Sequence, residues 1–168
     1  MLSLEDNKLT FILSKLFVVV VVVSLLVGSI VYLNRRWGKI RDIRRRADAQ
    51  SIAKALEFYN QQYNHYPYNS DNDGEGWDKS NDQDNRQFLE PLVSVGLLAS
   101  IPFDPLNDGE HYYRYRRLER EEFGCPNNNA VFQVTQFETS RPSHVKGDCP
   151  RLNLQEQAPN GYTWQGVE

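Results

Sequence analysis

Residues 16–33 read LFVVVVVVSLLVGSIVYL, an uncharged apolar run interrupted only by Ser24, Gly28, Ser29 and Tyr32. A helix rises about 1.5 Å per residue, so about 20 such residues cross a hydrocarbon core roughly 30 Å thick. The chain that follows, residues 34–168, is polar. The sequence therefore predicts a transmembrane helix at 11–34 that anchors one soluble head.

A cleaved secretory signal is the alternative interpretation of this run. Signal peptides usually have an apolar region of about 7 to 15 residues, followed by a small-residue cleavage site. Here the run is longer, and the NRRW sequence at 34–37 offers no such site. Tyr32 and Trp37 lie where an aromatic belt is expected at the membrane interface. These features favour a retained anchor.

The net charge of −3 is unremarkable, but basic residues are concentrated just after the apolar run. Seven of them are opposed only by Asp42: Arg35, Arg36, Lys39, Arg41, Arg44, Arg45 and Arg46. Such a cluster suits anionic lipid headgroups or ion pairs with neighbouring subunits. The positive-inside rule would place it in the cytoplasm.

The two cysteines, Cys125 and Cys149, favour the opposite orientation of the head. A lone pair in one polar domain is consistent with a disulfide formed in an oxidising compartment, and two unrelated free thiols are the alternative. Closing a loop of about 25 residues would stabilise the head by roughly 3 to 4 kcal/mol. The sequence thus leaves the membrane orientation open.

Helical periodicity continues past the apolar run, so we expect one helix from about Phe11 to about Tyr63, with residues 35–64 outside the membrane. Its apolar positions are Ile40, Ile43, Ala47, Ile52, Leu56, Tyr59 and Tyr63, and its polar face carries Arg41, Arg45, Asp48, Lys54, Glu57 and Gln61. Pro67 follows its end. The apolar stripe must be covered by the head or by another subunit.

The head, residues 65–168, shows the pattern of an α+β domain. It begins with an acidic loop at 69–85, followed by a short helix at 86–98 that buries Phe88, Leu89, Leu92 and Val93. Alternation predicts strands at 112–118, with Tyr and Arg on both faces, and at 130–138. Residues 152–168 are only loosely patterned. A long helix before a small antiparallel sheet of about three or four strands is the expected fold.

Three stretches resemble type IV pilins and type II secretion pseudopilins. Residues 47–59 (ADAQSIAKALEFY), followed by Tyr66-Pro67, resemble the family's helix ending in "AL..Y....G.YP". Residues 101–105 (IPFDP) and then 112–115 (YYRY) are similar to the family's "P.DP…Y.Y" pattern before the sheet. Residues 131–138 resemble the strand that follows. With the anchor, the resemblance spans about three quarters of the chain.

The N-terminus resembles the same family with two departures. Residues 1–10 are leader-like, and residues 11–20 (FILSKLFVVV) align with "FTLIELLVVI". Thr10 stands where the family has Gly before the prepilin-peptidase cut that would release Phe11 for methylation. Lys15 stands where the family has a Glu that meets the ammonium of the neighbouring subunit, and Lys would repel that ammonium. We therefore expect either a fibre-tip subunit or an uncleaved membrane protein.

The resemblance implies a structural subunit, minor or tip-located, that acts by assembly and not by catalysis. Its partners would be membrane lipid and other pilin-like subunits or assembly machinery, with lateral contacts through Ile40, Ile43, Ala47 and Ile52. It implies a single-pass protein of the bacterial inner or plasma membrane, with an extracytoplasmic head that reaches the cell surface in a fibre. The alternative is a permanently anchored extracytoplasmic binding protein with a pilin-like head.

Cofactor and metal signals are weak, so no cofactor is expected, with calcium the one ion considered. Asn69, Asp71, Asp73 and Gly74 resemble the start of an EF-hand, but Ser80 occupies the position of its bidentate Glu, and a solvated acidic loop is favoured. Pseudopilins often hold calcium in a loop of the sheet region. The corresponding candidates here are Asp104, Asn107, Asp108 and Asp148.

No catalytic or nucleic-acid signature stands out. His65, His111 and His144 are too scattered for a metal motif, and an extracytoplasmic enzyme is disfavoured because no catalytic set is visible. The YYRYRR sequence at 112–117 combines stacking and charge, as single-stranded nucleic acid requires. Glu119, Glu121 and Glu122 follow it, so sheet packing is favoured and a nucleic-acid partner is not expected.

Overall fold

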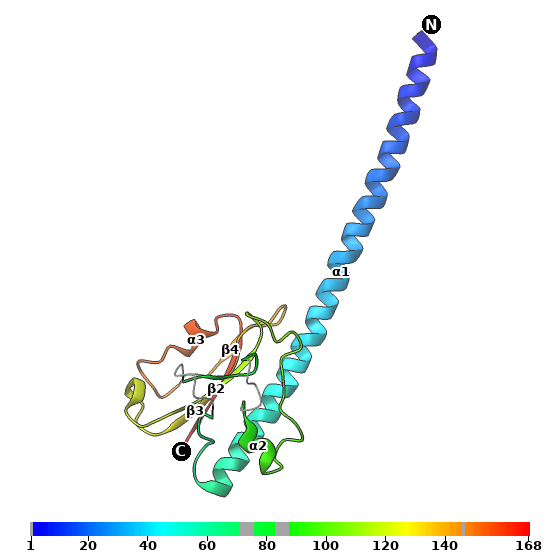
Figure 1. Cartoon of the computed structure of the whole chain (residues 1–168). Coiled ribbons are helices and arrows are strands. Elements are labelled where there is room, and N and C mark those ends of the chain that lie inside the picture. The colour runs from blue at the N-terminus through cyan, green and yellow to red at the C-terminus, as the bar shows by residue number, and fades with distance from the viewer. Residues whose placement is uncertain (1, 71–75, 83–87, 146) are drawn as a thin grey trace. The chain divides into compact units, whose positions relative to one another are not determined.

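The structure is a computed structural model that describes residues 2–70, 76–82, 88–145 and 147–168, with side chains from Leu13 onward. It divides into two compact units, Met1–Gly38 and Lys39–Glu168 (Figure 1). Helix α1 (Leu2–Tyr63) contributes to both. Its predicted end at Tyr63 is confirmed, and its beginning lies nearer the N-terminus than the predicted Phe11.

The first unit consists of the N-terminal part of α1. Residues 13–37 are exposed throughout. Among the described residues, α1 is the one helix that is long and apolar enough to span a membrane. A signal sequence near the N-terminus would meet the same length and hydropathy criteria. Both serines of the apolar run satisfy their hydroxyls within the helix: Ser24 Oγ donates to the Val20 carbonyl and Ser29 Oγ to the Leu25 carbonyl, each at 2.8 Å. Internal hydrogen bonds of this kind let polar side chains lie in hydrocarbon at low cost.

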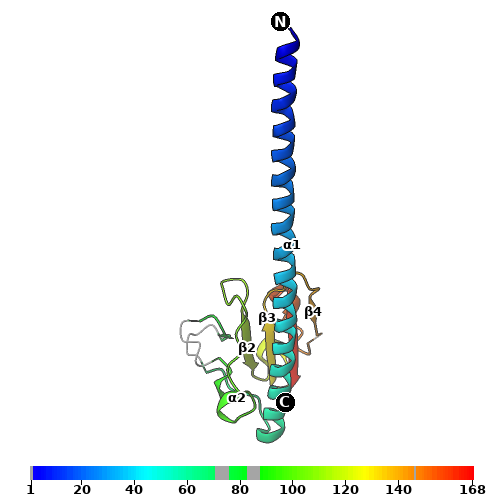
Figure 2. The ribbon, with the colours of Figure 1, turned by 90° about the vertical axis from the view of Figure 1, so that its right-hand side faces the viewer.

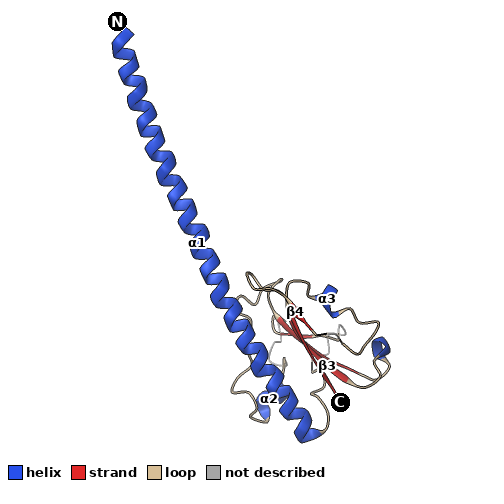
Figure 3. Cartoon of the chain, turned by 180° about the vertical axis from the view of Figure 1, so that it is seen from behind, coloured by secondary structure: helices blue, strands red, loops and turns tan. Residues whose placement is uncertain are grey.

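The second unit, the head, combines the C-terminal part of α1 with one sheet (Figure 3). The other elements are β1 (Asp78–Lys79), α2 (Glu90–Ser94), β2 (Tyr113–Leu118), the 3-10 turn η1 (Glu122–Gly124), β3 (Asn129–Val134), β4 (Ser143–His144), α3 (Leu154–Gln157) and β5 (Tyr162–Val167). The described strands lie in the order β1-β2-β3-β5-β4. The α+β class is confirmed.

The sheet differs from the predicted antiparallel one. It has five strands in the described chain, and β4 pairs with β5 in parallel, so the sheet is mixed. The predicted strand at 130–138 ends at Val134. The missed strand β5 begins after Gly161, where an added Cβ would lie 2.0 Å from the Val134 carbonyl oxygen. Only glycine therefore lets the chain run this close to β3.

The predicted helix at 86–98 is much shorter than expected. Its described part is α2, Glu90–Ser94, and residues 83–87 lie outside the described chain. Leu89 adopts a left-handed backbone with φ 53°, and Gly96 does the same with φ 77° just after the helix. These two positions interrupt the helical backbone on either side. Leu92, one of the predicted buried residues, is fully buried.

One face of the sheet packs on α1 and forms the main core (Figure 2). Strand β2 turns Tyr113 and Tyr115 inward, both at most 1% exposed, and places Arg114 on the other face. Arg117 shares the inner face with these two tyrosines, so this face mixes Tyr and Arg as predicted, while Arg116 lies with Arg114 on the other face. Both phenol groups are satisfied: Tyr113 donates to Asp48 Oδ2 at 2.9 Å and Tyr115 to the Pro67 carbonyl at 2.7 Å.

A second, smaller core lies on the opposite face of the sheet. It is made of Leu118, Cys125, Val131, Cys149 and Leu154. Cys125 and Cys149 form a disulfide within it, which confirms the predicted pair and excludes the alternative of two free thiols. The bond ties the turn after β2 to the long segment between β4 and α3.

Removal of the disulfide is expected to destabilise the head. The two cysteines are 24 residues apart, and loop-closure entropy predicts a loss of about 3.5 kcal/mol for Cys125→Ser with Cys149→Ser. Chemical unfolding of the full chain in detergent, followed by circular dichroism, measures the loss. A double variant within about 0.5 kcal/mol of the natural chain would contradict this stabilising role.

Candidate functional site

The part of α1 in the head has two distinct faces. The buried face carries Asp42, Arg45, Ala49, Ile52 and Leu56, at steps of three and four, and packs on the sheet and its loops. Ile52 is 0% exposed. It therefore lies apart from Ile40, Ile43 and Ala47, the residues with which it was grouped as an assembly stripe.

The opposite face of α1 carries exposed apolar side chains. Ile40, Ile43 and Phe58 are 56%, 68% and 57% exposed, and Ala47 is also exposed. Ile40 and Phe58 are 18 residues apart, which is five helical turns, so they lie on one line of the helix. Phe58 was missed by the sequence reasoning, although this spacing could have revealed it. We call Ile40, Ile43, Ala47 and Phe58 the outer face.

A buried ion cluster holds the start of the buried face against the head. Arg45 is 0% exposed and binds Asp104 through two hydrogen bonds, Nε to Oδ2 at 2.6 Å and Nη2 to Oδ1 at 2.9 Å. Its Nη1 donates to Asp42 Oδ1 at 2.9 Å and to Glu138 Oε1 at 2.8 Å. Arg41 adds two hydrogen bonds to Glu138. The guanidinium of Arg45 thus meets three carboxylates.

Asp42 also serves as an anchor for the segment after β3. Its carboxylate accepts hydrogen bonds from the backbone N–H groups of Glu138, Thr139 and Ser140 and from the Thr139 hydroxyl, at 2.7 to 3.0 Å. Burial alone would raise the pKa of Asp42, but these bonds and Arg45 lower it to about 2. The carboxylate therefore stays ionised in the folded head.

Hydrogen bonds also shift the pKa values of the other ionised groups in the cluster. The hydrogen bonds from Arg41, together with the one from Arg45, lower the pKa of Glu138 to about 2, although burial alone would raise it. Burial alone would lower the pKa of Arg45, but its bonds to Asp104 and Glu138 raise it above its ordinary value. The predicted placement of Arg45 on the polar outer side of the helix is therefore wrong. A charge was buried because three carboxylates surround it.

Acid is expected to weaken the head through this cluster. The lowered pKa values of Asp42 and Glu138 mean that their stabilisation is complete above about pH 4.5 and is lost as the pH falls towards 2. Thermal melting of the full chain at several pH values measures this loss. Glu138→Gln should flatten the dependence, whereas Glu156→Gln, at an exposed residue, should not. An unchanged slope in the Glu138 variant would contradict the assignment.

Some of the basic residues that follow the apolar run form contacts within the head. Arg41 and Arg45 are paired within the head, and Arg46 donates to the Arg141 carbonyl at 3.0 Å and lies over the Phe137 ring. Arg35, Arg36, Lys39 and Arg44 remain exposed. Lipid headgroups or neighbouring subunits would therefore meet fewer basic side chains than the sequence suggests.

The calcium candidates lie apart or are occupied. Both oxygens of Asp104 bind Arg45, and Asp108 Oδ1 accepts from the backbone of Glu110 and His111. Asp71 and Asp73 fall outside the described residues. Among the residues that are described, no group of three or more His, Cys, Asp or Glu is placed to hold a metal ion. The expectation that no cofactor is bound, with calcium the one ion considered, stays a prediction.

All but the first residue of the YYRYRR sequence lies in β2, and its arginines stack on aromatic side chains of the head. Arg114 lies over Trp77 at 4.4 Å and Arg117 over Tyr68 at 4.5 Å, measured to the ring centres. Arg117 also binds Glu168 through Nε at 2.9 Å and Nη2 at 3.0 Å. These contacts favour the sheet-packing interpretation.

The N-terminal candidates lie in the first unit. Thr10 and Phe11 are in α1, in the part without described side chains, and Lys15 is exposed. The structure places them on one continuous helix and leaves their processing and assembly roles as predictions.

Comparison with known proteins gives no family for this chain. No protein-family model, no curated protein and no solved structure matches it.

Proposed function

We propose that the chain is a pilin-like structural subunit of a type IV pilus or a type II secretion pseudopilus, in a minor or tip position, that acts by assembly. One observation carries the proposal: α1 supplies both an exposed apolar span at 16–33 and the helix on which the head's sheet packs. The disulfide supports an extracytoplasmic head, since such bonds persist in oxidising compartments.

Assembly on this proposal is a transfer of apolar surface. Side chains of the span leave lipid for similar contacts with neighbouring helices, so packing supplies the driving force and no bond is made or broken. In the head, the outer face provides lateral contacts to other subunits. Membrane lipid and pilin-like subunits are the corresponding partners, and the single-pass location in the bacterial inner or plasma membrane follows.

Ile43→Asp is expected to abolish co-purification of the chain with other pilus or pseudopilus components. Ile43 is 68% exposed, so its substitution should change the free energy of unfolding by no more than about 0.5 kcal/mol. Ala47→Asp should act alike. Co-purification from detergent extracts and the melting temperature are the two measurements.

Leu106→Asp is the matched control, because it places the same charge on an exposed apolar residue of a head loop. Its co-purification should be unchanged. If Ile43→Asp still co-purified at the natural level, the outer face would not be the assembly surface.

Lys15 and Thr10 favour a second candidate, a permanently anchored extracytoplasmic binding protein with a pilin-like head. Thr10 replaces the Gly expected before the cleavage site, which weakens the usual processing. Lys15 replaces the Glu that would pair with an incoming ammonium. Mass spectrometry of the N-terminal residue, in membrane fractions and in sheared surface fractions, separates the two candidates. Methylated Phe11 in sheared material would support the subunit. Intact Met1 confined to membranes would refute it and leave the anchored protein.

A further inference from the structure

A surface hollow of about 300 Å³ lies between α1 and the loop that follows α2. It is lined by Arg44, Asp48 and Ser51 on the α1 side and by residues 98–103 on the loop side. All of these residues belong to the head. Ala47 of the outer face comes three residues after Arg44 and four before Ser51, so the hollow borders the outer face.

Asp48 has one carboxylate oxygen that is free to accept a hydrogen bond. Its Oδ2 accepts from the Tyr113 hydroxyl at 2.9 Å, and Arg44 Nε lies 3.8 Å from that same oxygen, beyond hydrogen-bond distance. Oδ1 accepts from no residue in the described part of the chain, and it is not buried. Since the Asp48 side chain is 24% exposed and lines the hollow, Oδ1 is open to an incoming donor.

The charge on Asp48 is poorly compensated within the head. Burial, together with the nearby charge of Asp104, raises the pKa of Asp48 above its ordinary value, although the hydrogen bond from Tyr113 and the charge of Arg44 oppose the rise. The folded head therefore disfavours the ionised carboxylate relative to the unfolded chain. Arg44 compensates only weakly, because its side chain is 64% exposed and solvent screens its charge. A cation at Oδ1 would supply the missing compensation.

The rest of the lining offers further acceptors and an apolar wall. Ser51 Oγ has no hydrogen-bond partner among the described residues, and the carbonyl groups of residues 99–101 accept from none of them either. Leu98, Ile101 and Phe103 supply apolar surface. This combination suits a long aliphatic stem that ends in a charged donor.

The free oxygen favours lysine over arginine as that donor. A guanidinium binds a carboxylate best when it reaches both oxygens, and Tyr113 already occupies Oδ2 of Asp48. An ammonium is a compact charge with three donors, so it can bind Asp48 Oδ1 and use the neighbouring hydroxyl and carbonyl oxygens for its other hydrogens.

We infer that the hollow receives a lysine side chain of the neighbouring subunit, whose ammonium binds Asp48 Oδ1 and Ser51 Oγ. The inference rests on the proposed assembly through the outer face, because a subunit seated there brings its side chains to the hollow. The apolar contacts of the outer face are non-directional, whereas one ion pair at a defined place fixes the register of the two subunits.

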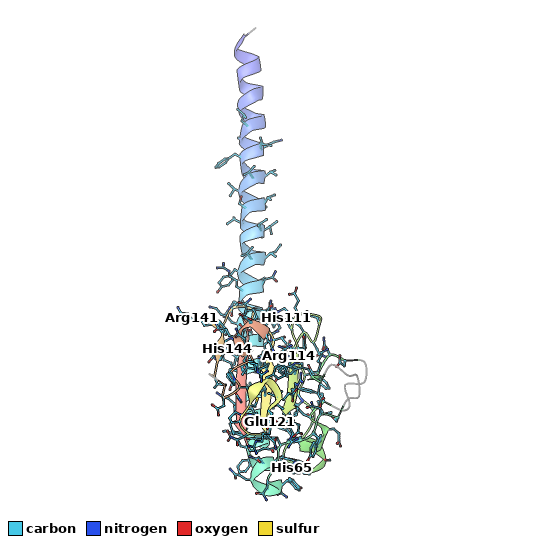
Figure 4. The ribbon with its side chains drawn as sticks, turned by 90° about the vertical axis from the view of Figure 1, so that its left-hand side faces the viewer. His65, His111, Arg114, Glu121, Arg141 and His144 are labelled. Atoms are coloured by element: carbon cyan, nitrogen blue, oxygen red, sulfur yellow. A yellow bond between two sulfur atoms is a disulfide. The ribbon has the colours of Figure 1, made fainter. Side chains whose placement is uncertain are left out.

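n-Butylammonium chloride carries the ammonium and stem of lysine and tests the hollow in the full chain, held in a nonionic detergent. The Ser100 and Ile101 amide resonances should shift saturably at constant ionic strength. n-Butanol and sodium butanoate, the neutral and anionic probes of similar length, should give no such shifts. His65, at the lower end of the head in Figure 4, follows the end of α1 about 22 Å beyond Asp48 and serves as the unshifted reference. Equal responses to the three probes, or none to butylammonium, would overturn the inference.

Asp48→Asn separates the charge of Asp48 from its structural role. Asparagine still accepts from Tyr113, so the melting temperature should not fall, and butylammonium should bind about tenfold more weakly because a charge-assisted hydrogen bond is lost. Glu57→Gln is the matched control, since it removes an exposed carboxylate from the same helix and should leave binding unchanged. Equal weakening in the two variants would show general charge attraction and refute a specific site.

Co-purification with other pilus or pseudopilus components distinguishes this inference from the proposed function. Asp48→Asn should reduce co-purification, and Glu57→Gln should not. If Ile43→Asp abolished co-purification while Asp48→Asn left it at the natural level, the subunit proposal would stand and the lysine site would be wrong. If Ile43→Asp had no effect while butylammonium still bound through Asp48, assembly through the outer face would fail, and a free amine would replace the neighbouring subunit as the ligand.

Discussion

Arg45→Met is expected to destabilise the head by about 3 to 5 kcal/mol, the cost of removing one partner from a buried ion cluster. Methionine fills most of the volume of the arginine stem but leaves Asp104 without either of its hydrogen bonds from the guanidinium. Glu138 keeps Arg41, and Asp42 keeps its backbone donors. Asp104 keeps the backbone N–H of Leu106 on Oδ1 at 2.9 Å, but its Oδ2 loses the donor that it has in the natural chain, so the uncompensated charge is concentrated there. Chemical unfolding of the full chain in detergent measures the loss.

Two variants keep this prediction testable even when Arg45→Met fails to fold. Arg44→Met removes an arginine from the next position, where the side chain is 64% exposed, and should cost no more than about 1 kcal/mol. Adding Asp104→Asn to Arg45→Met removes the stranded charge and should recover part of the loss. If the Arg44 and Arg45 variants were equally stable, the cluster would have no structural role.

The helix and the fold class were predictable because their signals are local. The period of apolar residues and the proline at 67 place the end of α1 at Tyr63. The two-residue strands β1 and β4 are too short to show any alternation. The strand β5 alternates aromatic and polar residues from Tyr162 to Gln165, but Pro159 and Gly161 before it read as a turn. Its pairing with β3 depends on a close backbone approach that no sequence pattern reports.

The ion cluster was missed because its partners are far apart in sequence. Asp104 and Glu138 lie 59 and 93 residues from Arg45, so a single arginine in a basic stretch gave no reason to expect burial. A partial signal existed in the i,i+3 pair Asp42–Arg45, which lies in line with Ala49 and Ile52. A hydrogen-bonded row of side chains across the sheet was equally hidden, because strand register alone brings its members together: Arg114, Gln133, Thr163 and His144.

The second large effect is expected in the apolar span. Val22→Arg with Leu26→Arg places two charges on one side of the helix near the middle of residues 16–33. Each charge costs about 2.5 to 3.5 kcal/mol at the centre of a membrane helix, so the pair should reduce insertion by about 5 to 7 kcal/mol. Both positions are exposed in the first unit, so the fold of the head should be unaffected. The fraction of chain that stays in membranes after an alkaline wash measures insertion.

Val22→Leu with Leu26→Val is the matched control, since it exchanges apolar side chains at the same positions and should remain in the membrane. Retention of the arginine variant at the control level would contradict a spanning role. The length of the natural chain after processing decides how a loss of membrane retention is interpreted, because charges in its apolar region also stop a signal sequence from directing export. If the natural chain keeps residues 16–33 in the membrane fraction, the arginines abolish an anchor. If the natural chain is recovered in soluble form without residues 16–33, the introduced arginines block export of a signal sequence. The subunit proposal and the anchored-protein proposal then both fail.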